Sequence, residues 1–240
     1  MLPLDYYSLL DAFKHKGCPI CFLLQRDAQR MLDAIFHEHV TEPEMHEIIR
    51  KRRGLCNAHG WQLTELRGHT LGMAILFRAA VDEALTISAA ALPSTATATA
   101  ATSRLGRLLK KPDASAAALA EALAPTGPCP ICKGKAKTER EYQSTVAKFI
   151  GDEVFKAGYA ASSGLCLPHF RGALSCASDP AATRLLVSLQ SQKWHAIKDE
   201  LSVLIGKYDY RRAQELVGDE GDSHLRAIRD MVGARGVFGE

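Results

Sequence analysis

The sequence predicts an all-α protein made of two related helical modules. Ala, Leu, Lys, Arg and Glu are plentiful while β-branched and aromatic residues are few, which favours helix over strand. A pair of Cys/His motifs occurs twice, in the same order and at nearly the same spacing, which indicates an internal duplication. In both copies, apolar residues recur at the spacing of an amphipathic helix.

Each copy of the repeated motif has two halves. The first half reads Cys-Pro-Ile-Cys and the second reads Gly-Leu-Cys-x-x-His, with 34 residues between them in the first copy (56−21−1) and 33 in the second (166−132−1). Three thiolates and one imidazole form the ligand set of a closed tetrahedral metal site. We therefore expect each copy to bind one zinc ion, two per chain, through Cys18, Cys21, Cys56 and His59 in the first copy and Cys129, Cys132, Cys166 and His169 in the second.

The elements of the first copy follow from periodicity and helix-end signals. Segment 22–39 carries an apolar stripe, and Pro43 suits the first turn of a helix over 44–53 that Gly54 ends. The chain is again expected to be helical from Asn57, and a long helix is expected over about 70–90. Because two helices and a turn fill the gap between the motif halves, we expect a hairpin whose open end the metal closes.

The second copy repeats this plan, with helices expected over 134–150, 152–161, 167–177 and 180–206. Residues 93–102 form an Ala/Thr/Ser run typical of a flexible linker, and short helices are expected over 104–111 and 113–124. The tail predicts a final helix at 222–229. These elements place a first module at 1–92, a flexible linker with short helices at 93–127, and a second module with a C-terminal helix at 128–240.

Composition and motifs limit the function classes. A net charge of +3 is too small to indicate a nucleic-acid or membrane partner by itself. The N-terminus lacks a signal-peptide pattern and no apolar stretch is long enough to span a bilayer, so we expect a cytoplasmic protein whose cysteines hold metal rather than form disulfides. No nucleophile–base or paired-carboxylate pattern stands out. We therefore expect a non-enzymatic, zinc-stabilised scaffold or adaptor with another protein as its partner.

Two alternative functions stay open at this point. An iron–sulfur cluster bound by Cys₃His would make the chain a redox, electron-transfer or sensor protein. Nucleic-acid binding rests on the basic runs at 50–53 and 133–140, although cations are also favoured at a helix C-terminus. A thioredoxin-like site would need strands, and haem c attachment would need His where Phe22 and Lys133 stand.

The paired motifs resemble those of a bacterial and archaeal family of uncharacterised proteins, known only as a domain of unknown function. The resemblance covers nearly the whole chain, since residues 207–211 and 222–228 are similar to its C-terminal signatures. It implies the same eight ligands, and it implies no reaction, substrate or partner.

Overall fold

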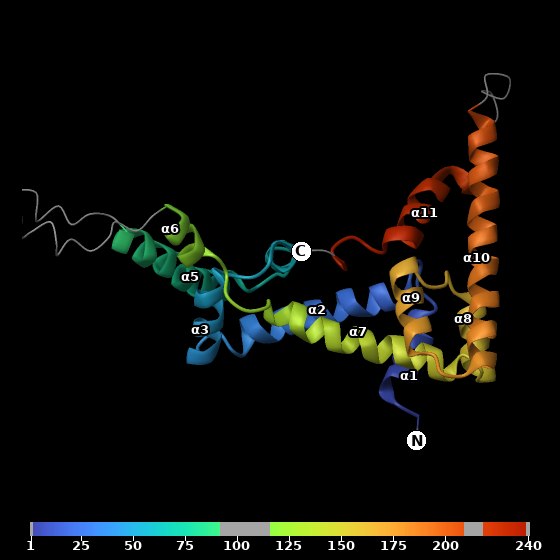
Figure 1. Cartoon of the computed structure of the whole chain (residues 1–240), viewed down its shortest axis with the longest axis horizontal. Coiled ribbons are helices and arrows are strands. Elements are labelled where there is room, and N and C mark those ends of the chain that lie inside the picture. Colours follow the sequence, from blue (N-terminus) through green and yellow to red (C-terminus); the bar gives the residue numbers. More distant parts are fainter. Residues whose placement is uncertain (1, 92–115, 209–217, 239–240) are drawn as a thin grey trace, which may run out of the picture. The chain divides into compact units, whose positions relative to one another are not determined.

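The computed structural model describes residues 2–91, 116–208 and 218–238, and within these residues the chain is helical with no strand (Figure 1). The all-α prediction is confirmed. The helices are α1 (Leu4–Ala12), α2 (Pro19–His37), α3 (Pro43–Arg52), α4 (Asn57–Leu63), α5 (Thr70–Ala91), α6 (Ala116–Leu123), α7 (Pro130–Phe149), α8 (Glu153–Ala161), α9 (Leu167–Cys176), α10 (Pro180–Lys207), the 3₁₀ turn Asp219–Asp222 and α11 (Ser223–Val232).

Most helix ends follow the signals in the sequence. Pro43 opens α3, and Arg53 ends it in the left-handed conformation at φ 59°. Gly54 follows at φ +111°, and its N–H donates to the carbonyl of Ile49, which closes the end of the helix. The predicted linker at 93–102 and the predicted helix at 104–111 lie outside the described residues.

Two features of the helices differ from the expectation. Helices α2 and α7 begin at the proline inside the Cys-Pro-Ile-Cys motif, a few residues before the predicted starts at 22 and 134, because proline is well suited to the first helical position. Helix α1 was not predicted. Its buried face consists of Tyr6, Leu9 and Ala12, three residues apart.

The chain divides into two compact units, which differ from the expected contiguous modules. Unit 1 comprises residues 1–30 and 133–240, and unit 2 comprises residues 31–132. The division falls inside α2 and again inside α7, so each unit contains residues from both copies of the motif.

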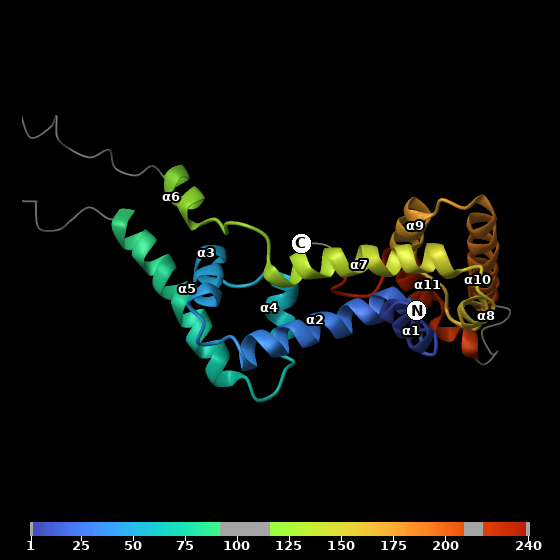
Figure 2. The same ribbon diagram turned by 90° about the horizontal axis from the view of Figure 1, so that it is seen from below.

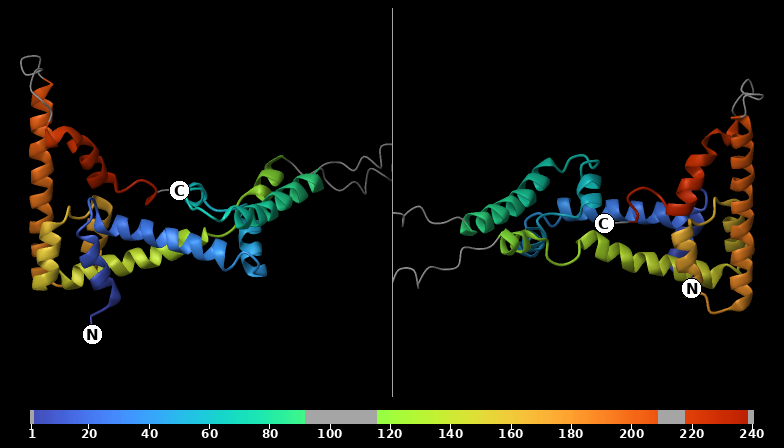
Figure 3. Two further views of the ribbon diagram at one scale, coloured as in Figure 1. Left: turned by 180° about the vertical axis from the view of Figure 1, so that it is seen from behind. Right: turned by 45° about the horizontal axis from the view of Figure 1, so that its top comes forward.

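The core of unit 1 surrounds two of the motif cysteines. Phe155 of α8 is fully buried, with its ring centroid 5.0 Å from that of Phe13 and 5.3 Å from that of Tyr6, both on α1 or at its end. Cys21 and Cys166 belong to the same buried cluster. Figures 1 and 3 show α8, α9, α10 and α11 gathered around the start of α2 and the end of α7.

Two hydrogen bonds join α1 to the start of α8 in unit 1. The Tyr6 hydroxyl donates to Asp152 Oδ1 at 2.6 Å, and the same oxygen accepts the backbone N–H of Phe155 at 3.0 Å. Asp152 is therefore the N-cap of α8 and also the anchor for α1.

Unit 2 is built on the packing of α3 against α5 (Figure 2). Ile49, Leu63 and Leu76 are buried in it. The segment after α6 is joined to the end of α3, because Thr126 N–H donates to the carbonyl of Lys51 at 3.0 Å. This hydrogen bond holds the segment that leads into the second Cys-Pro-Ile-Cys motif, whose Cys132 lies beside His59 of α4.

Candidate metal centres

The eight predicted ligands form two groups of four, and within each group the potential ligand atoms lie within 4.8 Å of one another. We call them site A and site B. Site A lies in unit 1 and consists of Cys18, Cys21, Cys166 and His169; site B lies in unit 2 and consists of Cys56, His59, Cys129 and Cys132.

Each unit thus holds one Cys₃His group, but the predicted grouping by copy is wrong. Site A takes its Cys-Pro-Ile-Cys half from the first copy and its Gly-Leu-Cys-x-x-His half from the second, and site B does the reverse. Helix lengths explain why. Helix α2 runs 16 residues on from Cys21 to His37 (37−21) and carries the chain about 24 Å, whereas α3 has 10 residues and could return it only about 15 Å. Helices α7 and α8, of 20 and 9 residues, are mismatched in the same way.

Both halves of the motif place their ligands at the N-terminus of a helix. Cys166 is the N-cap of α9 with an extended backbone, and His169 is the third residue of that helix. Cys18 immediately precedes α2, and Cys21 is the third residue of α2. Residues three apart at a helix start lie on one side of it, so two helix N-termini meet at site A. Their partial positive charge favours thiolates.

In site A the imidazole presents Nδ1 to all three sulfurs. His169 Nδ1 lies 3.3 Å from Cys18 Sγ, 3.4 Å from Cys21 Sγ and 3.2 Å from Cys166 Sγ. The sulfurs of Cys21 and Cys166 are 3.7 Å apart. The four atoms therefore enclose a single point.

Site B has the same arrangement, with α4 and α7 as the two helices. His59 Nδ1 lies 3.1 Å from Cys56 Sγ, 3.3 Å from Cys132 Sγ and 3.7 Å from Cys129 Sγ. The sulfurs of Cys56 and Cys132 are 3.6 Å apart. Each site keeps one partly exposed cysteine, Cys18 in site A and Cys132 in site B.

The electrostatics of site B favour a bound cation. Burial opposes ionisation of Cys129, but hydrogen bonds from His59 and from backbone N–H groups bring the pKa of this thiol down to about 6. Burial and the charge of Cys129 raise the pKa of the Cys132 thiol to about 12. Three thiolates at this separation are thus mutually repulsive, and a divalent cation between them removes that repulsion.

The distances fit one tetrahedral ion. With metal–sulfur bonds of about 2.3 Å and metal–nitrogen bonds of about 2.0–2.1 Å, the edges of a tetrahedron are about 3.8 Å between sulfurs and about 3.6 Å between sulfur and nitrogen. The sulfur–sulfur distances of 3.6 and 3.7 Å and the sulfur–nitrogen distances of 3.1–3.7 Å lie close to these values. In the described part of the chain, no other group of three or more His, Cys, Asp or Glu side chains lies close enough to hold a metal ion.

Basic residues at the end of α3 form ion pairs and hydrogen bonds with neighbouring parts of unit 2. Arg50 and Lys51 lie 3.6 and 3.1 Å from carboxylate oxygens of Glu47. Arg53 donates to the carbonyl oxygens of Arg50 and Ala122, at 2.6 and 2.7 Å. These cations close a helix end, as the macrodipole interpretation expects.

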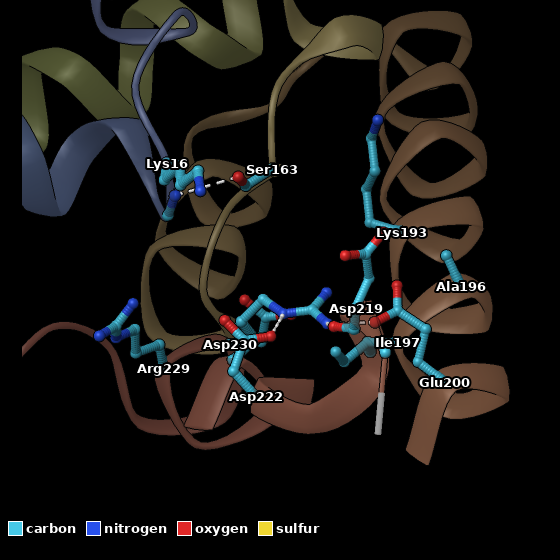
Figure 4. Close-up of a pocket in the computed structure, with 13 residues that line it drawn as sticks. Lys16, Ser163, Lys193, Ala196, Ile197, Glu200, Asp219, Asp222, Arg229 and Asp230 are labelled. Atoms are coloured by element: carbon cyan, nitrogen blue, oxygen red, sulfur yellow. Dashed lines mark hydrogen bonds and ion pairs between the residues drawn. The ribbon is translucent and has the colours of Figure 1, made fainter. Parts of the chain in front are cut away.

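A cavity of about 640 Å³ lies in unit 1, between the loop before Cys18, α10 and α11 (Figure 4). Basic and acidic side chains line it in equal number, and Arg226 pairs with Asp222 at 2.7 Å and with Glu200. Burial raises the pKa of Asp230 to about 6. The lining contains no histidine or cysteine, but it includes Gly17, the residue before the ligand Cys18, and the charge of Cys18 contributes to the raised pKa of Asp230.

The sequence did not indicate the carboxylate that lies behind site A. Glu139 of α7 places Oε1 3.3 Å from His169 Nε2, the ring nitrogen that faces away from the sulfurs. No sequence motif includes this residue. It lies ten residues after Cys129, on the face of α7 that approaches α9.

None of the described helices combines the length and apolar character needed to cross a membrane. No curated protein and no solved structure matches the chain. The model of one family, described as a family of unknown function (DUF6062), matches residues 4–236. With all eight motif ligands inside the matched range, the chain belongs to this family of unknown function.

Proposed function

We propose that this protein is a zinc-stabilised helical scaffold or adaptor, without enzymatic activity, that binds two zinc ions and presents its helices to another protein. The observation that carries the proposal is the pair of Cys₃His groups, each with its ligand atoms within 4.8 Å of one another. Three thiolates and one imidazole already fill four positions around an ion, so no position is left for a substrate. Closed sites of this kind are structural.

The ligand spacing supports a single zinc ion rather than an iron–sulfur cluster. In a cluster, cysteines bound to different irons are separated by iron and sulfide atoms, so their sulfurs lie farther apart than those around one ion. Here all four ligand atoms of each site lie within 4.8 Å of one another. The six motif cysteines are also free thiols, in keeping with a reducing cytoplasmic location, which we include in the proposal.

An exposed apolar stripe supports the adaptor role. On α11, Leu225, Ile228 and Val232 follow helical spacing and are 48%, 56% and 60% exposed. The opposite face of the same helix carries Arg226, which pairs with Glu200 of α10. A surface helix with its polar face inward and its apolar face outward is suited to binding a protein.

Metal analysis with an absorption spectrum, on protein purified without oxygen, tests the metal assignment. We expect two zinc ions per chain and no visible absorption. Cys132→Ser should lose one ion, while Cys176→Ser, outside both sites, should keep two. Iron with acid-labile sulfide and a visible band that bleaches on reduction would replace the proposal with a redox function.

Removal of the metal tests the structural role. Because metal binding free energy is folding free energy in such sites, dialysis against a chelator should lower the melting temperature strongly, and added Zn²⁺ should restore it. An unchanged melting temperature in metal-free protein would contradict the structural role.

The adaptor role is tested separately. Ile228→Glu should abolish co-purification of the native partner while the zinc content and melting temperature stay unchanged. Retention of the intact protein on DNA or RNA that falls steeply with salt would instead favour nucleic-acid binding.

A further inference from the structure

Site A has a second layer of contacts behind its histidine. His169 is fully buried, and its Nε2 atom lies 3.3 Å from Oε1 of Glu139, within ion-pair distance but without the alignment of a hydrogen bond. A carboxylate behind a metal-binding histidine fixes the ring orientation, keeps the proton on the outer nitrogen and makes the inner nitrogen a stronger ligand. Here the inner nitrogen is Nδ1, the atom that faces the three sulfurs.

Glu139 is itself held in place. Gln143, one turn further along α7, donates from Nε2 to Glu139 Oε1 at 3.1 Å. The Gln143 side chain lies against Gly172 of α9, where an added Cβ would come within 2.3 Å of it. The glycine at 172 therefore leaves the room that Gln143 needs to support the carboxylate.

The end of the chain covers the other side of site A. We call residues 233–238 the C-terminal strap. The N–H of Ala234 points to Cys21 Sγ at 3.4 Å, and the Phe238 ring lies against His169 with a centroid distance of 4.7 Å. Gln25 Nε2 fixes the strap by donating to the carbonyl of Arg235 at 2.9 Å.

Among the residues that the structure describes, site B has no such carboxylate behind its histidine. Aligning the copies at the first cysteine (129−18 = 111) places Ala28 at the position of Glu139 and Leu32 at that of Gln143, so the first copy has apolar side chains at both positions. In the described part of the chain, His59 forms no ion pair with a carboxylate, although its Nδ1 atom faces the sulfurs as in site A.

From these contacts we infer that the two metal sites differ in function: Glu139 is a positioning residue that makes site A a permanent anchor, and site B is the exchangeable site. This inference rests on the proposed function, since it requires both sites to bind zinc. Loss of such a partner carboxylate typically weakens metal binding about 10–100-fold.

Zinc release from the full-length protein, loaded with two Zn²⁺ ions and mixed with a chromophoric chelator, tests the inference. We expect two phases of one ion each. Cys132→Ser should remove the fast phase and leave the slow one. Glu139→Gln should accelerate the slow phase about 10–100-fold without changing the fast phase. Glu141→Gln, the same change at an exposed position of α7, should leave both phases as they are.

A second readout separates positioning from general stability. In ¹⁵N-labelled protein, the Nε2 proton of His169 should be protected from exchange with water, and Glu139→Gln should remove that protection at an unchanged melting temperature. Release of both ions in one phase, or a slow phase insensitive to Glu139→Gln, would overturn the inference alone. A chain that takes up fewer than two zinc ions overturns the proposed function and the inference with it.

Discussion

Dividing the chain into two polypeptides tests how the motif halves pair. Residues 1–103 contain all four ligands of the first copy, and residues 104–240 contain all four of the second. In the structure, each site takes two ligands from residues 1–103 and two from residues 104–240. We therefore expect that neither polypeptide alone holds zinc tightly, and that the two expressed together form a complex with two zinc ions.

Pairing across the copies requires longer loops, and the free energy of zinc binding exceeds the cost of closing them. The observed pairing leaves 144 residues between Cys21 and Cys166 (166−21−1) and 69 between His59 and Cys129 (129−59−1), against 34 and 33 for pairing within a copy. The longer loops cost about 1.3 and 0.7 kcal/mol more to close. A structural zinc site contributes about 10–16 kcal/mol, so the longer loops do not prevent pairing across the copies. In the divided protein, even about 10 kcal/mol corresponds to a dissociation constant for zinc of about 0.1 µM or tighter.

The assay is affinity purification through a tag on residues 1–103, followed by size-exclusion chromatography and metal analysis. The matched control carries Cys21→Ser and Cys132→Ser, one substitution in each site, and should retain little zinc. If residues 1–103 purified alone carry one zinc ion and do not need the second polypeptide, the ligands pair within a copy and the structural grouping is refuted.

Three further predictions follow from individual contacts. The double variant Cys18→Ser/Cys166→Ser should keep one zinc ion per chain, because both residues belong to site A, whereas Cys18→Ser/Cys56→Ser should keep none. Phe155→Ala should lower the free energy of unfolding by about 3–5 kcal/mol in chemical denaturation, because it empties a fully buried position. Tyr6→Phe should lower the melting temperature most near neutral pH: the tyrosine hydroxyl lowers the pKa of the carboxylate that caps α8, so its stabilisation is present above the unfolded pKa of about 4 and is lost as pH falls through the lower folded value.

The controls for these predictions are direct. Pairing within a copy would exchange the zinc contents of the two double variants. Leu4→Ala removes a side chain that is 84% exposed, and an effect equal to that of Phe155→Ala would contradict the burial argument. A Tyr6→Phe deficit that grows in acid would show that the hydroxyl does not act through the ionised carboxylate.

The sequence was sufficient to predict the fold class, most helices and the eight residues that gather in the sites. It could not predict their grouping, because the two copies of each half-motif offer the same atoms to either partner. The information lay in helix length. The predicted helices over 22–39 and 44–53, of 18 and 10 residues, are as unequal in length as the observed helices of 19 and 10, so the mismatch was already present in the predicted elements.

Other misses have local causes. Helix α1 has no clear apolar stripe in the sequence, because its apolar residues come as the neighbouring pairs Tyr6–Tyr7 and Leu9–Leu10, of which Tyr6 and Leu9 are buried and Tyr7 is exposed. The role of Glu139 depends on how α7 approaches α9, and a single glutamate among the charged residues of α7 gives no sign of it.

The exchange of motif halves has a consequence for biosynthesis. A ribosome delivers Cys18, Cys21, Cys56 and His59 first, and these four already form a complete Cys₃His set that could capture an ion in the wrong combination. The correct partners of His59 begin to emerge 70 residues later (129−59), and site A is complete only after His169. Site B can therefore close before site A, and early metal capture by the four ligands of the first copy competes with correct assembly.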